Sequence, residues 1–321
     1  MNRSLLSAIR RRQHGLTLVE LMVALALGLF LAGVVSWTYL QTASGARFGA
    51  LESQMNEEGA LALDLVRSHL RLVGYSEVDG NGKRIFKGSP LLGCDGGFTQ
   101  ATASGGFDSL ACEGGSNSDA IALRYQTTAF NAYMVGSPQK PANCANAGID
   151  PTIGGAAIAD NRFYVAADAT NGNVPTLYCR GSNGLNSFSG EAALVPNVEH
   201  LQLRYAITRT PIVGEVPPHQ VTAIVASADL PGKDWTRVAA VEVCLVMRSA
   251  QPVPRGGLTM DEVTRHFDCE GQEKTAADGR LRRTYRTMVP LPNVRPALPK
   301  PYQVDAGGGV INPYADLNGA P

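Results

Sequence analysis

The sequence lacks the short motifs that mark the common enzyme classes. Its 321 residues contain no Gly-x-Ser-x-Gly elbow, no phosphate-binding Gly-x-x-x-x-Gly-Lys loop, no Gly-x-Gly-x-x-Gly turn after a strand and no His-Glu-x-x-His zinc motif. The five histidines are scattered along the chain, and we expect His69 to lie on the polar side of a helix. We therefore expect no enzymatic activity, no cofactor and no metal site.

The sequence also lacks an excess of charge of either sign and is poor in aromatic residues. Lys+Arg and Asp+Glu balance at 28 each, so the overall charge does not indicate a nucleic-acid partner. With 7% aromatic residues, 35 Gly and 19 Pro, we expect many turns and a modest helical share beyond the N-terminus. A local cluster of arginines at 280, 282, 283 and 286 could contact phosphate, but a solvated or subunit-facing strand edge is the preferred interpretation.

No Cys-x-x-Cys pair occurs among the six cysteines, which argues against zinc. An even number spread through the chain favours disulfides if the protein is exported. Six cysteines allow fifteen pairings. We predict that each cysteine pairs with its nearest neighbour in the sequence. Each short loop closed in this way would stabilise the fold by about 3 kcal/mol. The predicted pairs are Cys94–Cys112, Cys144–Cys179 and Cys244–Cys269.

One long hydrophobic run stands near the N-terminus, from Leu16 to Leu40. At 1.5 Å a residue, about 25 helical residues cross a bilayer core. Several arginines precede the run and none follows it before Arg47, which orients the N-terminus toward the cytoplasm. The preceding arginines are Arg3, Arg10, Arg11 and Arg12.

An ordinary secretory signal peptide fits this run poorly, because the run is long and Ala43-Ser44-Gly45 is a weak cleavage site. A plain transmembrane anchor stays open as an alternative. The informative residue is Glu20, since a carboxylate at such a depth costs about 3 kcal/mol. A lone acid inside a membrane segment is a functional residue by default and needs a cationic partner.

The segment from Arg10 to Glu20 resembles the signal of type IV pilins and pseudopilins. It has a short basic leader, Gly15 at the cut, an apolar residue after it and a glutamate at the fifth mature position. Leu16 departs from the phenylalanine that is usual in the family. The resemblance implies that a prepilin peptidase removes a leader of residues 1–15 and methylates the new amine of Leu16. It also implies that Glu20 pairs with the N-terminal amine of a neighbouring subunit.

The helix is predicted to continue beyond the membrane. Apolar residues recur at steps of three and four, which is typical of one face of an amphipathic helix, and Gly74 is a plausible stop. We predict one helix over 16–73, with 16–40 transmembrane, and keep two separate helices as the alternative. The predicted face consists of Met55, Gly59, Ala62, Val66, Leu70 and Val73.

Beyond the helix the pattern changes to strands. Alternating apolar residues predict a mostly antiparallel β domain over 74–295, with loops over 76–118. A Pro- and Gly-rich segment over 296–321 is predicted to be a flexible tail. The predicted strands are 119–126, 162–167, 176–180, 198–207, 235–248 and 281–289.

Three of these strand segments resemble, in order and spacing, the PilW family of minor pilins. They read VPNVEHLQLRYAI, VAAVEVCLVMRSA and RLRRTYRTMVPLPN and cover roughly residues 195–295. Leu291-Pro292-Asn293 departs from the Leu-Arg-Asn that is more frequent there. The family is similar in turn to J-type pseudopilins, whose body is two facing sheets. The resemblance implies an α+β fold, with the long helix packed on a largely antiparallel two-sheet domain.

The function that this resemblance implies is that of a minor pilin, which helps to initiate or cap a type IV pilus. The expected partners are other minor and major pilins, the prepilin peptidase and the inner-membrane assembly platform. We expect a single-pass inner-membrane protein with a periplasmic globular domain that later enters the pilus. Alternatives are a J-type pseudopilin of type II secretion, and a pilus-tip adhesin or DNA-binding subunit that uses loops 127–160 and 181–192. A tethered enzyme is the least favoured alternative.

Overall fold

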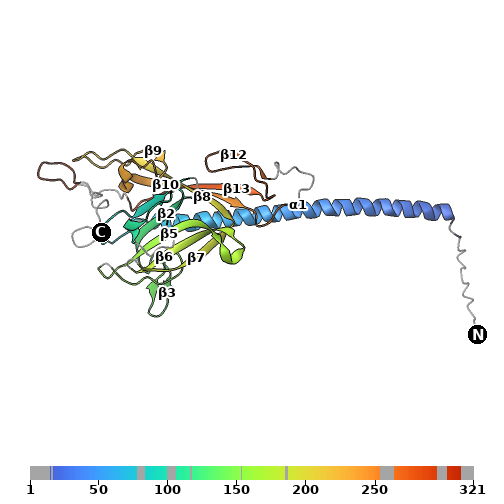
Figure 1. Ribbon diagram of the computed structural model, residues 1–321, viewed down its shortest axis with the longest axis horizontal. Helices are drawn as coiled ribbons and strands as arrows, with labels where there is room; N and C mark the ends of the chain where they lie inside the picture. The colour runs from blue at the N-terminus through green and yellow to red at the C-terminus, as the bar shows by residue number, and fades with distance from the viewer. Residues whose placement is uncertain are drawn as a thin grey trace, which may run out of the picture. The chain divides into compact units, whose positions relative to one another are not determined.

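The computed structural model describes residues 15, 17–77, 84–99, 106–115, 118–152, 154–184, 187–253, 264–294 and 302–311. It divides into two units, Met1–Ala50 and Leu51–Pro321. One continuous helix, α1 (Leu18–Leu72), contributes to both units, and everything else that the structure describes in detail belongs to the second unit (Figure 1). The choice between one helix and two is therefore decided in favour of one.

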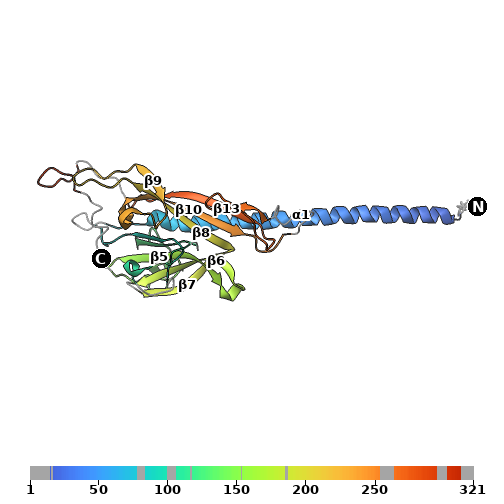
Figure 2. The same cartoon turned by 45° about the horizontal axis from the view of Figure 1, so that its top comes forward.

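The second unit contains two large antiparallel sheets (Figures 1 and 2). In the five-stranded sheet the order is β1-β2-β5-β6-β7, and in the four-stranded sheet it is β13-β10-β8-β9. The first sheet consists of β1 (Leu91–Cys94), β2 (Ala120–Thr127), β5 (Ala157–Asp168), β6 (Val174–Gly184) and β7 (Ser187–Pro196). The second consists of β8 (Val198–Thr208), β9 (Val221–Val225), β10 (Val238–Arg248) and β13 (Arg282–Pro290).

Short elements complete the unit. Two small hairpins are formed by β3 (Met134–Val135) with β4 (Lys140–Pro141) and by β11 (His266–Phe267) with β12 (Glu273–Lys274). The 3-10 turns are Phe107–Ser109, Ala169–Asn171, Pro231–Lys233 and Trp235–Arg237.

The predicted α+β class and antiparallel sheets are confirmed, with differences in detail. The segment 181–192, predicted as a loop, is a hairpin formed by the end of β6 and most of β7. Residues 235–237 form a 3-10 turn before β10 rather than the start of the strand, because the Asp234 side chain accepts a hydrogen bond from Thr236 N at 3.1 Å. Within the predicted tail, Val310 pairs with Val304 and with Gly214.

The inner faces of both sheets carry the core. On β8 the alternating residues Leu201, Leu203 and Tyr205 are buried, as their spacing predicts. The two sheets are joined by Asp119, just before β2: its backbone N donates to Leu201 O at 2.7 Å and its carboxylate accepts from Leu203 N at 2.7 Å. Gly93 on β1 lies so close to the Tyr205 hydroxyl that a Cβ there would be 1.8 Å from it. Only glycine fits at this crossing of the two sheets.

The C-terminal end of α1 follows the predicted stop. Gly74 has φ of 76°, a left-handed conformation that glycine adopts without strain. Its backbone N donates to Arg124 O at 3.0 Å, and Tyr75 N returns to Leu72 O at 2.8 Å. The turn therefore satisfies backbone groups at the end of the helix while it directs the chain toward β2.

Candidate functional site

The start of α1 is held by a reciprocal capping arrangement. Thr17 Oγ1 accepts a hydrogen bond from Glu20 N at 3.2 Å, and the Glu20 carboxylate accepts from Thr17 N at 3.2 Å and from Thr17 Oγ1 at 3.3 Å. This is a capping box, in which a Thr and a Glu three residues later satisfy each other's free N–H groups. The sequence Thr-x-x-Glu at 17–20 is the signature of this box, a local role of Glu20 in addition to the predicted pairing with a neighbouring amine.

The residues predicted for processing lie directly before this cap. Gly15 is exposed, whereas Leu16, the predicted site of methylation, lies outside the described residues. Glu20 is exposed at the third position of the helix. The contacts described for its carboxylate are therefore the local ones to Thr17.

The helical residues that follow expose their apolar side chains. In the part of the chain that the structure describes, α1 is the one helix long and apolar enough to cross a membrane. Two of its threonine hydroxyl groups bond to the helix itself: Thr38 Oγ1 donates to Val35 O at 2.9 Å and Thr42 Oγ1 to Thr38 O at 2.8 Å. Polar groups that are satisfied locally do not require water. The exposed apolar residues include Leu21, Leu25, Leu29, Phe30, Val35 and Trp37.

The later residues of α1, 51–72, run alongside the two sheets in Figures 1 and 2, and one stripe of them is buried. The predicted apolar face is confirmed, and Tyr285 of β13 packs on it at Gly59, where an added Cβ would be 2.8 Å from the ring. The Tyr285 hydroxyl donates to Asn56 Oδ1 at 2.5 Å. Aromatic packing on a glycine fixes the helix against the sheet with little freedom to slide. The buried helical residues are Met55, Gly59, Ala62, Val66 and Leu70.

Charged side chains flank this stripe. Glu52 Oε1 accepts from Arg283 Nη2 of β13 at 3.0 Å, and Asn293 Nδ2 donates to Arg71 O at 2.9 Å. The first is a partly exposed ion pair, which contributes at most about 1 kcal/mol, and the second is a neutral hydrogen bond of similar size. They define where the helix lies along the sheet more than they stabilise the fold.

His69 is the one residue of this helical region whose environment differs most from the sequence prediction. It was assigned to the polar side, yet its Nδ1 lies 2.6 Å from the Tyr125 hydroxyl of β2, and its ring packs 5.2 Å from that of Phe163. Burial lowers its pKa to about 4, so the ring is neutral at physiological pH. Position 69 follows Val66 by three residues and therefore faces the same side of the helix.

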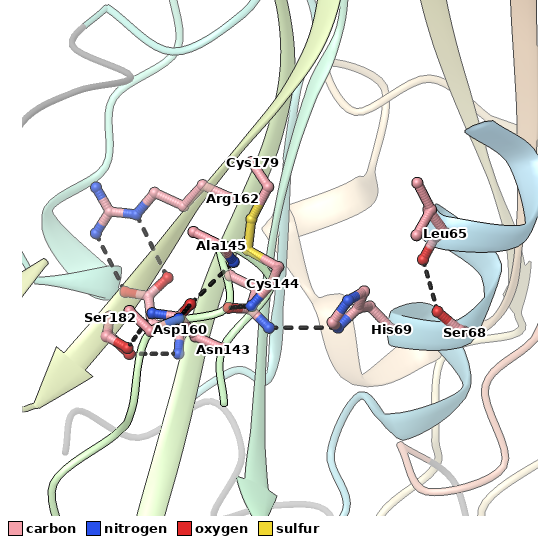
Figure 3. Close-up of a disulfide and its surroundings, with 12 residues drawn as sticks. Leu65, Ser68, His69, Asn143, Cys144, Ala145, Asp160, Arg162, Cys179 and Ser182 are labelled. Atoms are coloured by element: carbon pink, nitrogen blue, oxygen red, sulfur yellow. Dashed lines mark hydrogen bonds and ion pairs between the residues drawn. A yellow bond between two sulfur atoms is a disulfide. The ribbon is translucent and has the colours of Figure 1, made fainter. Parts of the chain in front are cut away.

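Hydrogen bonds connect His69 to the region of the Cys144–Cys179 disulfide, and Figure 3 shows these three residues together. Asn161 of β5 donates to the Tyr125 hydroxyl at 2.9 Å, and its Oδ1 accepts from Cys144 N at 3.2 Å. A short polar chain thus joins the helix to the Cys144–Cys179 pair; its central residues Tyr125 and Asn161 are buried, whereas His69 and Cys144 are half-buried. Buried polar groups linked in this way specify one arrangement of the packed elements.

The three disulfides of the structure are the nearest-neighbour pairs. Their Cα–Cα separations of 5.1, 6.1 and 5.9 Å lie in the usual range. Cys94–Cys112 closes the chain after β1, Cys144–Cys179 joins the loop after β4 to β6, and Cys244–Cys269 holds the β11–β12 hairpin to the outer face of β10. The structure describes no free cysteine.

The arginine cluster lies at an edge strand, as predicted, and Arg286 is exposed, but its arginines also have partners within the chain. Arg282 is buried and pairs with Glu199 at 2.6 Å and with Asp278 at 2.8 Å. The hydrogen bond from Arg282 holds the pKa of Asp278 at about 2. Arg286 pairs with Glu242 at 3.3 Å. With these internal partners, the cluster is not a free anion-binding edge.

Two further surface features distinguish the β unit. In the loop before β3, Phe130 is 100% and Tyr133 87% exposed. On the other sheet, an open cleft of about 930 Å³ lies between β8, β9 and the β11–β12 hairpin. No group of three or more potential metal ligands occurs among the residues described here.

Two family models match parts of this chain, one at the apolar helix and one in the two-sheet domain. Residues 10–36 match the prokaryotic N-terminal methylation motif, which defines the class as proteins with a prepilin-type N-terminus. Residues 162–293, from β5 to the end of β13, match the type IV pilus-assembly protein W family, PilW. The chain thus matches the PilW family of type IV pilus-assembly proteins over these residues and carries the methylation motif at its N-terminal end. Neither a curated protein nor a solved structure matched the chain.

Proposed function

We propose that this protein is a minor pilin, a structural subunit that helps to initiate or cap the type IV pilus. The observation that carries the proposal is the start of α1. There a carboxylate stands at the head of an exposed apolar helix, and its only described contacts are with Thr17. The match to the PilW family implies a structural and non-enzymatic role.

In this proposal the chain is made with a leader of residues 1–15 and a helix over 16–73, of which 16–40 span the inner membrane. The N-terminus is cytoplasmic, and the β domain over 74–295 with its tail over 296–321 is periplasmic. The prepilin peptidase cuts after Gly15 and methylates Leu16. The mature subunit then leaves the bilayer through the inner-membrane assembly platform and joins other minor and major pilins at the cell surface.

Glu20 supplies the driving interaction for this step. Its carboxylate costs about 3 kcal/mol in the bilayer core without a cation. The methylated amine of a neighbouring Leu16 removes that cost, because two opposite charges attract strongly where water is scarce. The pair specifies axial register between subunits more than total affinity.

Two related roles use the same helix. A J-type pseudopilin of type II secretion has the same processing and differs in the machine that it enters, which the adjacent genes identify. A pilus-tip adhesin is favoured by the fully exposed Phe130 and the nearby Tyr133, since exposed aromatic side chains are typical anchors of interfaces. Binding of the pilus to host or abiotic surfaces after Phe130→Ala separates this role from assembly alone.

The experiment is to complement a deletion strain and to measure processing and piliation together. We expect mass spectrometry to find an N-methylated Leu16 as the first residue. The deletion strain should have few pili at normal levels of the major pilin, and the wild-type gene should restore them. Gly15→Leu should block cleavage and piliation, whereas the matched variant Gly15→Ala keeps a small residue and should be processed. An N-terminus near residue 44, or normal piliation in the deletion strain, would contradict the proposal.

A further inference from the structure

The outer edges of the two sheets are unequally protected against pairing with another strand. Edge strands are normally blocked by charges, proline, bulges or short length. Strand β1 has four residues, β7 ends in Pro196 and pairs with β6 through several register shifts, and β13 carries Arg282, Arg283 and Arg286. Strand β9 has five residues and one register shift against β8, between Ile207 and Thr208, but it has none of these charges and contains no proline.

Strand β9 is apolar and open. It reads Val-Thr-Ala-Ile-Val over 221–225, and Val221 and Ile224 are 43% and 49% exposed. In the described part of the chain, its strand partner is β8 alone, with Ala206 opposite Ile224. In Figures 1 and 2, β9 lies at the margin of the sheet beyond β8 and β10. One row of its backbone groups therefore faces outward.

The cleft of about 930 Å³ begins at this strand, with Ile224 and Val225 on its rim. Six carboxylates line the cleft, and its only described lysine and arginine side chains are Lys274 and Arg204. Two of the six have cationic partners, since Glu199 pairs with Arg282 and Asp268 with Lys274. The other four form no ion pair with any residue that the structure describes, and these are Asp95, Asp119, Asp229 and Glu270.

The charges of the cleft act on one another. Burial, assisted by the nearby Asp95 and Glu270 carboxylates, raises the pKa of Asp119 to about 7 despite two backbone hydrogen bonds. Burial also lowers the pKa of His200, so this ring adds no positive charge at neutral pH. Even without the charge of Asp119, three carboxylates of the cleft, Asp95, Asp229 and Glu270, have no cationic partner among the described residues, a deficit of positive charge that a ligand can supply.

We infer that β9 accepts an extended segment of a partner protein as an additional strand, and that this segment carries lysine or arginine on the side facing the cleft. Strand addition obtains affinity from main-chain hydrogen bonds and specificity from alternate side chains. Apolar residues at the remaining positions, which face away from the cleft, would cover Val221. The inference goes beyond the assembly role and does not rest on it, because it concerns the β unit alone.

The test uses the full-length protein in nonionic detergent and synthetic peptides of about ten residues, labelled for fluorescence anisotropy. One peptide alternates lysine and valine, a second alternates glutamate and valine, and a third is the first with two valines replaced by proline. We expect saturable binding of the first peptide alone and slower amide hydrogen exchange over 221–225 in its presence.

Two variants of the same strand provide the matched comparison. Ile224→Lys places a cation on the rim of the cleft and should weaken binding about tenfold or more, since like charges repel at an interface. Val221→Lys makes the same change outside the cleft and should change binding about threefold or less. Asp229→Asn with Glu270→Gln, both exposed, should weaken it about three- to tenfold.

Three results would overturn the inference. They are no saturable binding of the lysine–valine peptide, equal binding of the peptide that contains proline, and equal effects of Ile224→Lys and Val221→Lys. Because both positions are exposed, unfolding curves of the two variants serve as the control that the sheet is intact. None of these results bears on processing or piliation, so they leave the proposed minor-pilin role to its own test.

Discussion

Helix α1 contains two regions with the same secondary structure and opposite surroundings. Over 18–40 its large apolar side chains are exposed, as for Leu25 at 59%. Over 51–72 its apolar stripe is buried, as for Leu70 at 0%. The later region finds its partners within its own chain, whereas no described residue covers the earlier one. A helix whose apolar residues are buried at one end and exposed at the other is suited to contact a membrane or another protein through its exposed end.

Two acidic residues of the helix show the same contrast. Glu52, in the buried region, pairs with Arg283 of β13 at 3.0 Å. Glu20, in the exposed region, bonds to Thr17 three residues away. The first has its cation within the chain, and the second has a local cap that a cation of a neighbour could replace.

The largest difference between the two regions is expected in the free energy of unfolding, when one leucine in each region is replaced by alanine. Leu70→Ala leaves a cavity under both sheets and should lower the free energy of unfolding by about 2–5 kcal/mol. Leu25→Ala removes the same atoms from an exposed position and should leave the unfolding of the β unit unchanged. Denaturant unfolding of the full-length protein in nonionic detergent measures both. Equal losses for the two variants would mean that the early region also packs on the β unit.

A smaller effect concerns the two buried groups that titrate. His69 has its pKa lowered to about 4, so the unfolded chain binds the extra proton and stability falls as the pH drops from about 6.5 to 4. Asp119 has its pKa raised to about 7, so the folded chain binds the extra proton and stability rises as the pH drops from about 7 to 4. In the wild type the two slopes offset each other over this range.

Single substitutions should separate the two slopes. His69→Gln leaves the Asp119 contribution, and stability should then rise on acidification by on the order of 1 kcal/mol per pH unit. Asp119→Asn leaves the His69 contribution, and stability should fall by a similar amount. Denaturation midpoints between pH 5 and pH 7 measure both. The same slope in both variants would show that neither group titrates as its burial implies.

The parts of the fold that are predictable from the sequence are those set by local spacing. Apolar steps of three and four identify the buried face of α1, and alternation identifies β8 and β10. Gly74 ends the helix because only a residue that accepts positive φ turns the chain there. These features are set by residues close together in the sequence, so the sequence alone predicts them.

The features that were missed depend on distant partners. Strand β7 contains glycine and serine and becomes a strand because β6 pairs with it. The start of β5 includes Asp160 and Asn161, polar residues that are buried because Arg162 and Tyr125 bond to them. His69 was assigned to the polar side of the helix by residue type, although its position belongs to the buried side. Tertiary contacts decide each of these cases.

The most direct test of the account compares Glu20→Leu with Glu52→Leu in a deletion strain, with membrane level and surface piliation scored separately. Loss of one partner of a buried ion pair costs about 3–5 kcal/mol, which is over a hundredfold in assembly. We predict that Glu20→Leu reaches the normal membrane level with pili lost or sharply reduced. Glu52→Leu, which loses only a partly exposed internal pair, should keep its pili. Normal piliation with Glu20→Leu at equal protein level would contradict the account, because the early region of the helix would then need no cationic neighbour.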